Sequence, residues 1–352
     1  MDAASGIPSP EEQNATPLQL SVIVPARNEE DCLEDCLRSL VSQSEAVFAL
    51  GVDWEILVVD DHSTDRTAEI AKSFAGVTVL RAPALPKGMT GKANAVWMAA
   101  KQAQGEWLLF TDADTVHEPG DLLRAIHEAK KAKVAMLSYS PRQVVTGFWQ
   151  RALMPLVFCE LALSYPPEKI SDPESTLAAA NGQFILIRQD AYFAVGGHGA
   201  VAESVLEDVA LARRVKRRKL GLRFRYAPDA VSTRMYRSFG AMYEGWTKNL
   251  ALLFGNALFL AAWRVIDLLL LVGLPVLFLE MYRPTMLWWV LMALWVRTLW
   301  RFYRRVARSN FPFWDCALGI FALPLFSWLL YRSWFHHTLI KRVVWKGRSY
   351  AS

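Results

Sequence analysis

The residues of this sequence best placed to do chemistry are two aspartates, Asp112 and Asp114, which directly follow an apolar run. The run, Trp-Leu-Leu-Phe-Thr at 107–111, predicts a buried β-strand that delivers both carboxylates to its end. Carboxylate oxygens suit Mg²⁺ or Mn²⁺, and such ions bind diphosphates. An Asp-x-Asp pair alone is more often a turn or a helix cap, so the prediction of a metal site depends on the surrounding elements.

Those elements alternate between strand and helix. Apolar runs at 18–25, 54–59, 77–80 and 107–111 predict strands, and helical segments separate them. This alternation predicts an α/β fold with a doubly wound, mostly parallel sheet. Three of the predicted strands end in acidic residues, and the carboxyl ends of parallel strands meet at one edge of a sheet. We therefore expect a ligand site at that edge.

Further along the chain, strands are predicted at 134–140 and 181–187, followed by a helix over 209–219. Glu207 and Asp208 stand at the start of this helix, and its end is strongly basic. Acids at the start and bases at the end of a helix also suit the helix dipole, which is the structural alternative to a role in a site.

Basic residues explain the net charge of +5 and the pI near 9.0, and they gather at 213–225, 297–308 and 341–348. Two of these clusters flank apolar tracts, so we expect anionic lipid headgroups and not nucleic acid as their partners. The scattered cysteines do not form a disulfide framework, and no secretory signal peptide precedes the first strand. We expect buried thiols and a first domain in the cytoplasm.

The second part of the chain is predicted to meet a membrane. Apolar tracts occupy 250–281, 285–296 and 311–331, with Trp and Tyr at their edges. The segment 147–167 is also apolar, but polar residues interrupt it, so we expect an interfacial helix there, with a buried core helix as the alternative. The number of crossings stays open, because a third full crossing would place the basic cluster at 341–348 outside.

In their order along the chain, these motifs resemble the family 2 inverting glycosyltransferases, which use nucleotide sugars on a GT-A fold. The resemblance is strongest to membrane-bound lipid and carotenoid glucosyltransferase-like members and covers roughly residues 18–250. The motifs that carry it are Val24-Pro25-Ala26-Arg27-Asn28-Glu29, Val59-Asp60-Asp61-His62-Ser63-Thr64-Asp65, Gly91-Lys92-Ala93-Asn94-Ala95, Thr111-Asp112-Ala113-Asp114 and Leu206-Glu207-Asp208.

The resemblance implies roles for individual residues. A divalent ion, Mg²⁺ or Mn²⁺, would be bound by Asp112 and Asp114, and Asp208 would be the general base with Glu207 beside it. Asp112 would hold either ribose or the metal. The residues expected to bind the nucleotide sugar are Pro25, Ala26, Arg27, Glu29, Asp60 or Asp61, Lys92, Asp112, Gly182, Arg237 and Trp246.

One departure from the family pattern affects the acceptor side. Processive polysaccharide synthases of the family carry Gln-x-x-Arg-Trp, and this sequence instead has Arg-Met-Tyr-Arg at 234–237 and Tyr-Glu-Gly-Trp-Thr-Lys-Asn at 243–249. We expect Trp246 either to stack near the acceptor or to anchor the protein at a membrane surface. Arg234 or Arg237 would help to neutralise the diphosphate. The missing motif favours addition of a single sugar over chain growth.

The sequence thus predicts a membrane-bound hexosyltransferase that moves one glucose, with UDP-glucose as the expected donor, to a lipid such as a carotenoid or other terpenoid. We expect a multi-pass protein of the cytoplasmic (inner) membrane with its catalytic domain in the cytosol. The alternatives are a polyprenyl-phosphate sugar transferase, an inactive sugar-nucleotide-binding scaffold and a metal-dependent nucleotide hydrolase. The expected parts are a disordered leader at 1–17, the GT-A domain at 18–250, a membrane region of two to four hydrophobic helices at 251–340 and a basic tail at 341–352.

Overall fold

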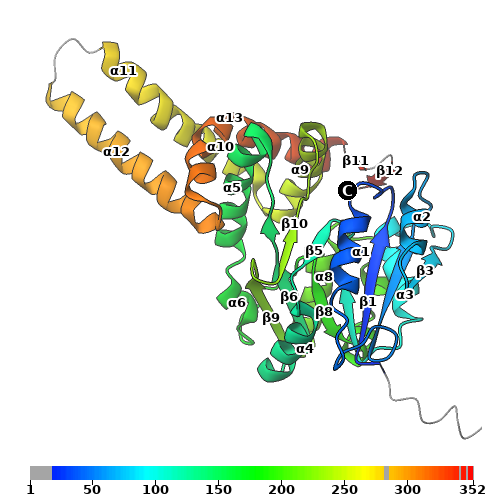
Figure 1. Ribbon diagram of the computed structural model, residues 1–352. Helices are drawn as coiled ribbons and strands as arrows, with labels where there is room; N and C mark the ends of the chain where they lie inside the picture. The colour runs from blue at the N-terminus through cyan, green and yellow to red at the C-terminus, as the bar shows by residue number, and fades with distance from the viewer. Residues whose placement is uncertain (1–17, 281–284, 341, 346–347, 352) are drawn as a thin grey trace, which may run out of the picture.

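A computed structural model describes residues 18–280, 285–340, 342–345 and 348–351 of the chain (Figure 1). The predicted disordered leader at 1–17 lies outside the described residues. A seven-stranded sheet, in the order β3-β2-β1-β4-β8-β6-β9, forms the centre of the first part of the chain. Its strands are β1 (Leu20–Ala26), β2 (Trp54–Asp60), β3 (Val77–Arg81), β4 (Trp107–Phe110), β6 (Met136–Ser140), β8 (Ile185–Arg188) and β9 (Leu222–Tyr226).

The sheet is mostly parallel, as predicted. Only β8 runs against its neighbours β4 and β6, while the pairs β1–β2, β1–β4, β2–β3 and β6–β9 are parallel. The strand predicted over 181–187 begins only at Ile185, because residues 181–184 form a turn in which Phe184 N donates to Asn181 O at 3.0 Å. This turn brings Gly182 to the carboxyl end of β4. A small second sheet has the order β5-β10-β7, with β5 (Thr115–His117), β7 (Arg142–Gln143) and β10 (Val231–Thr233).

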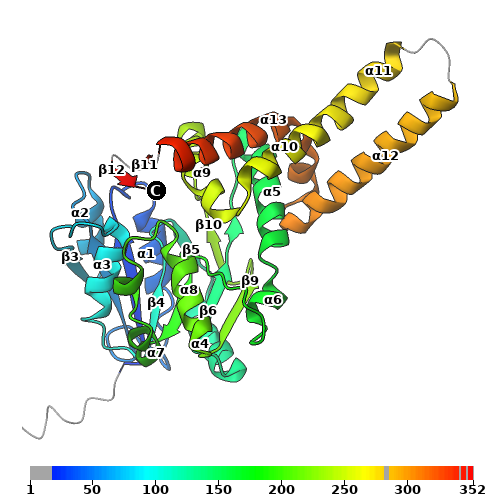
Figure 2. The same cartoon turned by 180° about the vertical axis from the view of Figure 1, so that it is seen from behind.

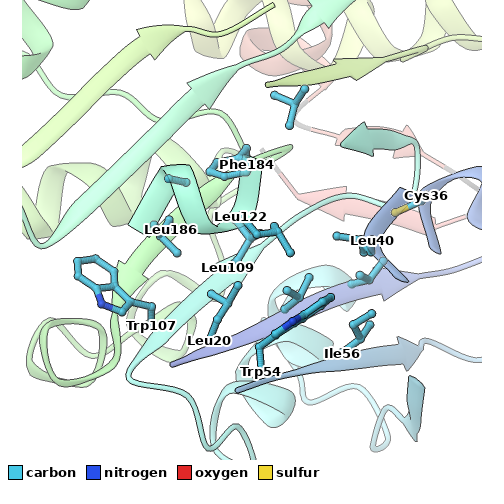
Figure 3. Packing of buried hydrophobic residues seen from close by; sticks show 14 of the residues in the cluster. Leu20, Cys36, Leu40, Trp54, Ile56, Trp107, Leu109, Leu122, Phe184 and Leu186 are labelled. Carbon is cyan, nitrogen blue, oxygen red and sulfur yellow. The ribbon is translucent and has the colours of Figure 1, made fainter. Parts of the chain in front are cut away.

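Helices cover both faces of the large sheet because successive strand side chains point to opposite sides. On one face Leu20 and Val22 of β1 pack with α1, α2 and α4, the core that Figure 3 shows; on the other, Ile23 packs with α3, α6, α7 and α8. The helices are α1 (Leu33–Val41), α2 (Thr67–Lys72), α3 (Gly91–Ala100), α4 (Asp121–Ala132), α6 (Pro167–Ser171), α7 (Gln189–Ala194) and α8 (Glu207–Arg217), with a 3₁₀ turn at His198–Val201.

A third apolar core is made mainly of helices. In Figures 1 and 2, α13 lies across α5, α9 and α10, while α11 and α12 extend together away from the rest of the protein. The elements are α5 (Gly147–Ser164), α9 (Phe239–Leu253), α10 (Ala257–Leu268), α11 (Leu274–Glu280), α12 (Met286–Val306) and α13 (Phe313–Phe335), with π-helical segments at Leu269–Gly273 and His336–Ile340 and a 3₁₀ turn at Ala307–Ser309. The strands β11 (Arg342–Trp345) and β12 (Arg348–Ala351) pair near the end of the chain.

Among the described residues, two helical segments are long and apolar enough to cross a membrane by length and composition, Ala257–Glu280 with 24 residues and Phe313–Ile340 with 28. They differ in burial, since half of the apolar window in the second is covered by the protein. The predicted interfacial helix is α5, which α13 covers: residues 152–160 are buried, and only the first turn exposes Phe148 and Trp149. The alternative of a buried helix therefore describes most of α5.

Charged residues that interrupt the apolar tracts form ion pairs between neighbouring helices. We call Glu160, Arg264, Asp267, Arg301 and Arg305 the helix network. Arg264 Nη1 lies 2.9 Å from Asp267 Oδ2 and 3.6 Å from Glu160 Oε1, and Arg301 Nη2 lies 3.3 Å from Asp267 Oδ1. Arg305 donates to Glu160, so the network joins α5, α10 and α12.

Candidate functional site

A pocket of about 500 Å³ opens at the carboxyl ends of β1, β2 and β4, where the sequence predicts a site. The backbone after β1 contributes Pro25, Ala26, Arg27 and Glu29 to its wall. Each strand is a buried apolar run that stops at polar residues, so the sheet holds these residues rigidly at one edge. The structure thus brings together the first predicted motif and the motifs that follow β2 and β4.

The two aspartates at the end of β2, Asp60 and Asp61, face different ways. Asp61 lines the pocket, and Arg27 Nη1 donates to its backbone oxygen at 2.8 Å and lies 3.9 Å from its carboxylate. Asp60 does not line the pocket; its carboxylate accepts a hydrogen bond from Ser63 N at 3.0 Å and shapes the loop. Of the two residues proposed to contact the nucleotide base, the geometry therefore favours Asp61.

Lys92 lies at the centre of the acidic side of the pocket. It stands at the start of α3, whose N-cap residue Thr90 accepts a hydrogen bond from Ala93 N. The Lys92 ammonium lies 2.6 Å from Asp112 Oδ1 and 3.3 Å from Glu207 Oε1. Burial alone would lower the pKa of Lys92, but these carboxylates raise it above its ordinary value. We call Lys92, Asp112, Glu207 and Asp208 the pocket network.

Asp208 is held by backbone N–H groups at both oxygens, with Gly182 N at 3.0 Å from Oδ2 and Val209 N at 2.7 Å from Oδ1. Burial and the negative charge of Glu207 raise the pKa of Asp208 to about 6. Burial acts on Glu207 too, but Lys92 lowers the pKa of Glu207 overall. Two adjacent carboxylates thus differ in basicity, and only Asp208 can exchange a proton near neutral pH.

Gly182 allows these groups to meet. A Cβ atom at this position would lie 3.1 Å from Lys92 Nζ and 3.5 Å from Asp208 Oδ2. A side chain there would therefore require the Lys92 ammonium to move by a few tenths of an ångström. This explains in physical terms why a glycine stands among the predicted site residues.

The pocket also contains oxygen ligands for a divalent ion. Asp112 and Asp114 both line it, but among the described residues no group of three or more His, Cys, Asp or Glu side chains is arranged to hold a metal. Mg²⁺ is commonly bound by one or two carboxylates together with substrate phosphates. The two aspartates fit an ion that shares its ligands with a bound diphosphate.

The wall opposite the sheet comes from residues 234–237 and from α9. Arg237 lines the pocket as predicted, and so does Arg234. Trp246 does not: it is only 2% exposed and packs between Phe158 and Tyr236, with ring centroids 6.4 and 5.7 Å away. Neither predicted role of Trp246, stacking on a ligand or anchoring at a membrane surface, fits this buried position.

The α9 residues that do line the pocket were not predicted. They are Ala241, Gly245, Lys248 and Asn249, on a helix face adjacent to the one that carries Met242, Trp246 and Leu250. A helix turns once in 3.6 residues, so this division was available from the spacing once the helix was assigned. The four cysteines are free and buried as expected, and Cys32 also lines the pocket, where its thiol donates to Glu29 Oε2 at 3.3 Å.

Comparisons with known proteins agree with this geometry. Residues 21–193 match the profile of glycosyl transferase family 2. The chain is 32% identical over 246 residues to a 4,4'-diaponeurosporenoate glycosyltransferase of Staphylococcus haemolyticus, covering 68% of this chain and 63% of that protein. A protein of the same name from Staphylococcus aureus strain USA300 is 26% identical over 237 residues, covering 66% and 60%. The aligned part thus spans about six tenths of the length of these relatives.

Among solved structures, the fold is similar to that of a mannosyltransferase from Pyrobaculum calidifontis in complex with GDP-Man and Mn²⁺. The TM-score is 0.55 at 16% sequence identity, and the match covers 93% of this chain and 90% of that one. At this identity the likeness concerns the GT-A fold alone.

Proposed function

This chain belongs to glycosyltransferase family 2, and from that premise we propose that it transfers one hexose from a nucleotide-diphosphate sugar to a membrane lipid of the carotenoid or terpenoid type. The observation that carries the proposal is the pocket network. It places a cation next to a strand-end aspartate, and within the same cluster a carboxylate whose pKa is about 6. A diphosphate leaving group and an attacking oxygen need these two features together.

On the donor side, we assign the nucleotide to the corner formed by Pro25, Ala26, Arg27, Glu29 and Asp61. Lys92 would then stand beside the diphosphate, with α3 directing its first N–H groups to the same place. When bound by Asp112 and Asp114, Mg²⁺ or Mn²⁺ supplies further positive charge to the leaving group. UDP-glucose is the donor we expect.

The transfer is a single displacement. An acceptor oxygen forms a bond to the anomeric carbon while the bond from that carbon to the diphosphate breaks, and the configuration inverts. If the acceptor is a hydroxyl group, Asp208 takes its proton, a contribution of about 10²- to 10⁴-fold in rate. If the acceptor is already an anion, no proton has to be removed, and Asp208 matters less.

The acceptor class is inferred from two observations. The relatives are named for a carotenoid carboxylate, diaponeurosporenoate. In this chain α9 separates the pocket from the apolar helix layer, which contains the two segments long enough to cross a membrane. We propose a GT-A domain at 18–250 in the cytosol and a membrane region at 251–340, so that a lipid reaches Asp208 without leaving the bilayer.

The test is transfer of radiolabelled hexose into the organic phase of membranes that contain the protein. UDP-glucose is tried first and then other UDP- and GDP-hexoses, with wild type, Asp208→Asn and Asp190→Asn. Asp190 is the matched control, because it is an exposed carboxylate paired with Arg188 at 2.5 Å and does not line the pocket.

The result expected for a hydroxyl acceptor is label in a neutral lipid, with wild type and Asp190→Asn active and Asp208→Asn nearly silent. Label in an acidic lipid with Asp208→Asn still active would identify an anionic acceptor, and chemical cleavage would separate a glycosyl ester from a polyprenyl phosphosugar. No label from any donor would overturn the transferase proposal and favour the scaffold.

A further inference from the structure

Helix α9 is a wall shared by the donor pocket and the apolar helix layer. Ala241, Gly245 and Lys248 line the pocket on one face. The other face, with Met242 and Trp246, is buried in the helical core. A molecule that is apolar at one end and reacts at the other must pass this helix to reach Asp208.

The pocket face of α9 carries small residues and then a cation, with the Tyr236 ring packed against Gly245. Ala241 and Gly245 are small, and Lys248 follows Gly245 by three residues, which places it on the same face about one turn further. The Lys248 ammonium lies in the field of Glu207 and of the other pocket carboxylates. Burial lowers the pKa of Lys248, and these acids oppose that shift.

Contacts with the end of α13 hold this part of α9 in place. His337 Nε2 donates to the backbone oxygen of Lys248 at 2.7 Å, and Ala251 N donates to Ser333 Oγ at 2.8 Å. Next to the lysine, Asn249 also lines the pocket, and its Oδ1 is buried with no hydrogen-bond partner among the described residues. The wall therefore presents a positioned cation and a polar group toward the site.

The other cations of the pocket are placed elsewhere. Lys92 is bound between Asp112 and Glu207 on the donor side. Arg27 Nη1 lies 3.9 Å from the Asp61 carboxylate, Arg234 Nη2 donates to Thr146 Oγ1 at 3.0 Å, and the charge of Arg237 acts on Cys32, the N-cap residue of α1. A negatively charged acceptor that approaches Asp208 would meet carboxylates there, and Lys248 is the cation on the α9 side that offsets them.

We propose that Lys248 is the subsite for an ionised carboxylate on the acceptor lipid, and that it selects acids over alcohols. The inference rests on the proposed transfer to a lipid. The ammonium pairs with the carboxylate, one carboxylate oxygen forms the bond to the anomeric carbon, and the nucleoside diphosphate leaves as an anion. No proton is removed, Lys248 stays protonated, and the product is a glycosyl ester.

Exposed aromatic rings mark the path of the lipid tail away from Lys248. Phe239 lies 6.0 Å from Trp149 and 6.1 Å from Tyr243 between ring centroids, and Trp328 Nε1 donates to the Tyr243 hydroxyl at 2.8 Å. Phe239, Trp149 and Trp328 are exposed. Phe239 and Tyr243 belong to the first turns of α9, Trp149 to α5 and Trp328 to α13, so the aromatic rings connect these three helices.

The experiment compares a polyene acid with its alcohol, retinoic acid with retinol, on the full-length protein in detergent. Wild type, Lys248→Met and Lys248→Arg are assayed, with Lys101→Met as the matched control because Lys101 is exposed on the surface over Trp97. Hydrogen bonds to charged groups are typically worth about 10- to 100-fold in binding. We expect Lys248→Met to lower the acid-to-alcohol ratio of kcat/KM at least tenfold through KM for the acid, and Lys248→Arg to restore part of it.

Binding is measured separately, by fluorescence quenching with retinoate and with retinol, so that the inference is tested even if neither probe accepts sugar. In that case the radiolabel assay in membranes decides the transferase proposal, while tenfold weaker retinoate binding by Lys248→Met would still support the subsite. Equal losses of binding for retinoate and retinol in Lys248→Met, or an unchanged acid-to-alcohol ratio of kcat/KM, would overturn the proposed carboxylate subsite.

Discussion

The pocket network and the helix network are two clusters of charged side chains with opposite balances of negative and positive groups. In the pocket network, three carboxylates surround a single ammonium, that of Lys92. In the helix network, three guanidinium groups surround the two carboxylates of Glu160 and Asp267. The side chains of Glu160, Arg264 and Asp267 are at most 5% exposed, whereas the Lys92 side chain is 36% exposed and opens to the pocket.

The comparison distinguishes charged side chains that stabilise the packing of helices from charged side chains that can take part in a reaction. In the helix network, each carboxylate is paired with two guanidinium groups, and the pairs join α5 to helices more than 100 residues later. In the pocket network, the negative charge exceeds the positive charge, and burial together with the charge of Glu207 raises the pKa of Asp208. The excess negative charge of the pocket network is neutralised only when a cation or a proton binds.

The largest effect should come from removing the single cation of the pocket network. In Lys92→Met, Asp112 and Glu207 lose their partner and the diphosphate loses a positive charge. Removing one preorganised electrostatic contact typically costs about 10²- to 10³-fold in rate, and we expect at least this loss in kcat/KM for hexose transfer. Lys101→Met serves as the control, and activity above a tenth of wild type would show that Lys92 has no such role.

The helix network should respond in stability and not in chemistry. Glu160→Gln leaves Arg264 and Arg305 with one carboxylate fewer, and breaking a buried ion pair typically costs about 3–5 kcal/mol. Thermal unfolding in detergent measures this loss, and activity per folded molecule should stay near wild type. Glu34→Gln breaks the exposed pair with Arg38 and should cost less than about 1 kcal/mol. Equal losses of stability in Glu160→Gln and Glu34→Gln would contradict the expected difference between a buried and an exposed ion pair.

The pH dependence of transfer should come from the pocket network. Asp208 accepts a proton only when it is ionised, and its pKa is about 6. With retinol as acceptor, the rate should therefore rise by about tenfold between pH 5 and pH 7. With retinoic acid the rise in rate between pH 5 and pH 7 should be smaller, since no proton is removed. A retinol profile that is flat over this range would exclude Asp208 as the base.

The smallest expected effect is a gain in stability. The pKa of Asp208 is raised in the folded protein, so the folded state binds the proton more tightly than the unfolded chain does. The contribution of Asp208 to stability is then greatest below its ordinary pKa and declines as the pH rises through about 6. Raising the pKa of an aspartate to about 6 costs about 3 kcal/mol at pH 7, and the hydrogen bond that the Asn amide cannot accept from Gly182 N or Val209 N offsets about 1–3 kcal/mol. At pH 7, Asp208→Asn should therefore be more stable than wild type by about 1 kcal/mol. Thermal unfolding at pH 5 and pH 7 tests this, since the gain should shrink at the lower pH.

Much of the site could be predicted because it depends on local signals. Asp61, Asp112 and Asp114 directly follow apolar strands, and the ends of parallel strands meet at one edge of a sheet. Glu207 and Asp208 begin a basic amphipathic helix, α8. The residues that the sequence analysis misplaced or missed, Trp246 and Lys248, lie on α9, where the tertiary packing determines which face is buried.

The sequence by itself determined the alternation of strands and helices, the order of the acidic motifs and the apolar character of the last hundred residues, because each depends on neighbours in the chain. Only the tertiary structure decided the antiparallel direction of β8, the inward position of Trp246 and the presence of Lys248 in the pocket. It also paired Glu160 with Arg264 and Arg305. These features depend on contacts between distant segments, for which local hydrophobic periodicity carries no information.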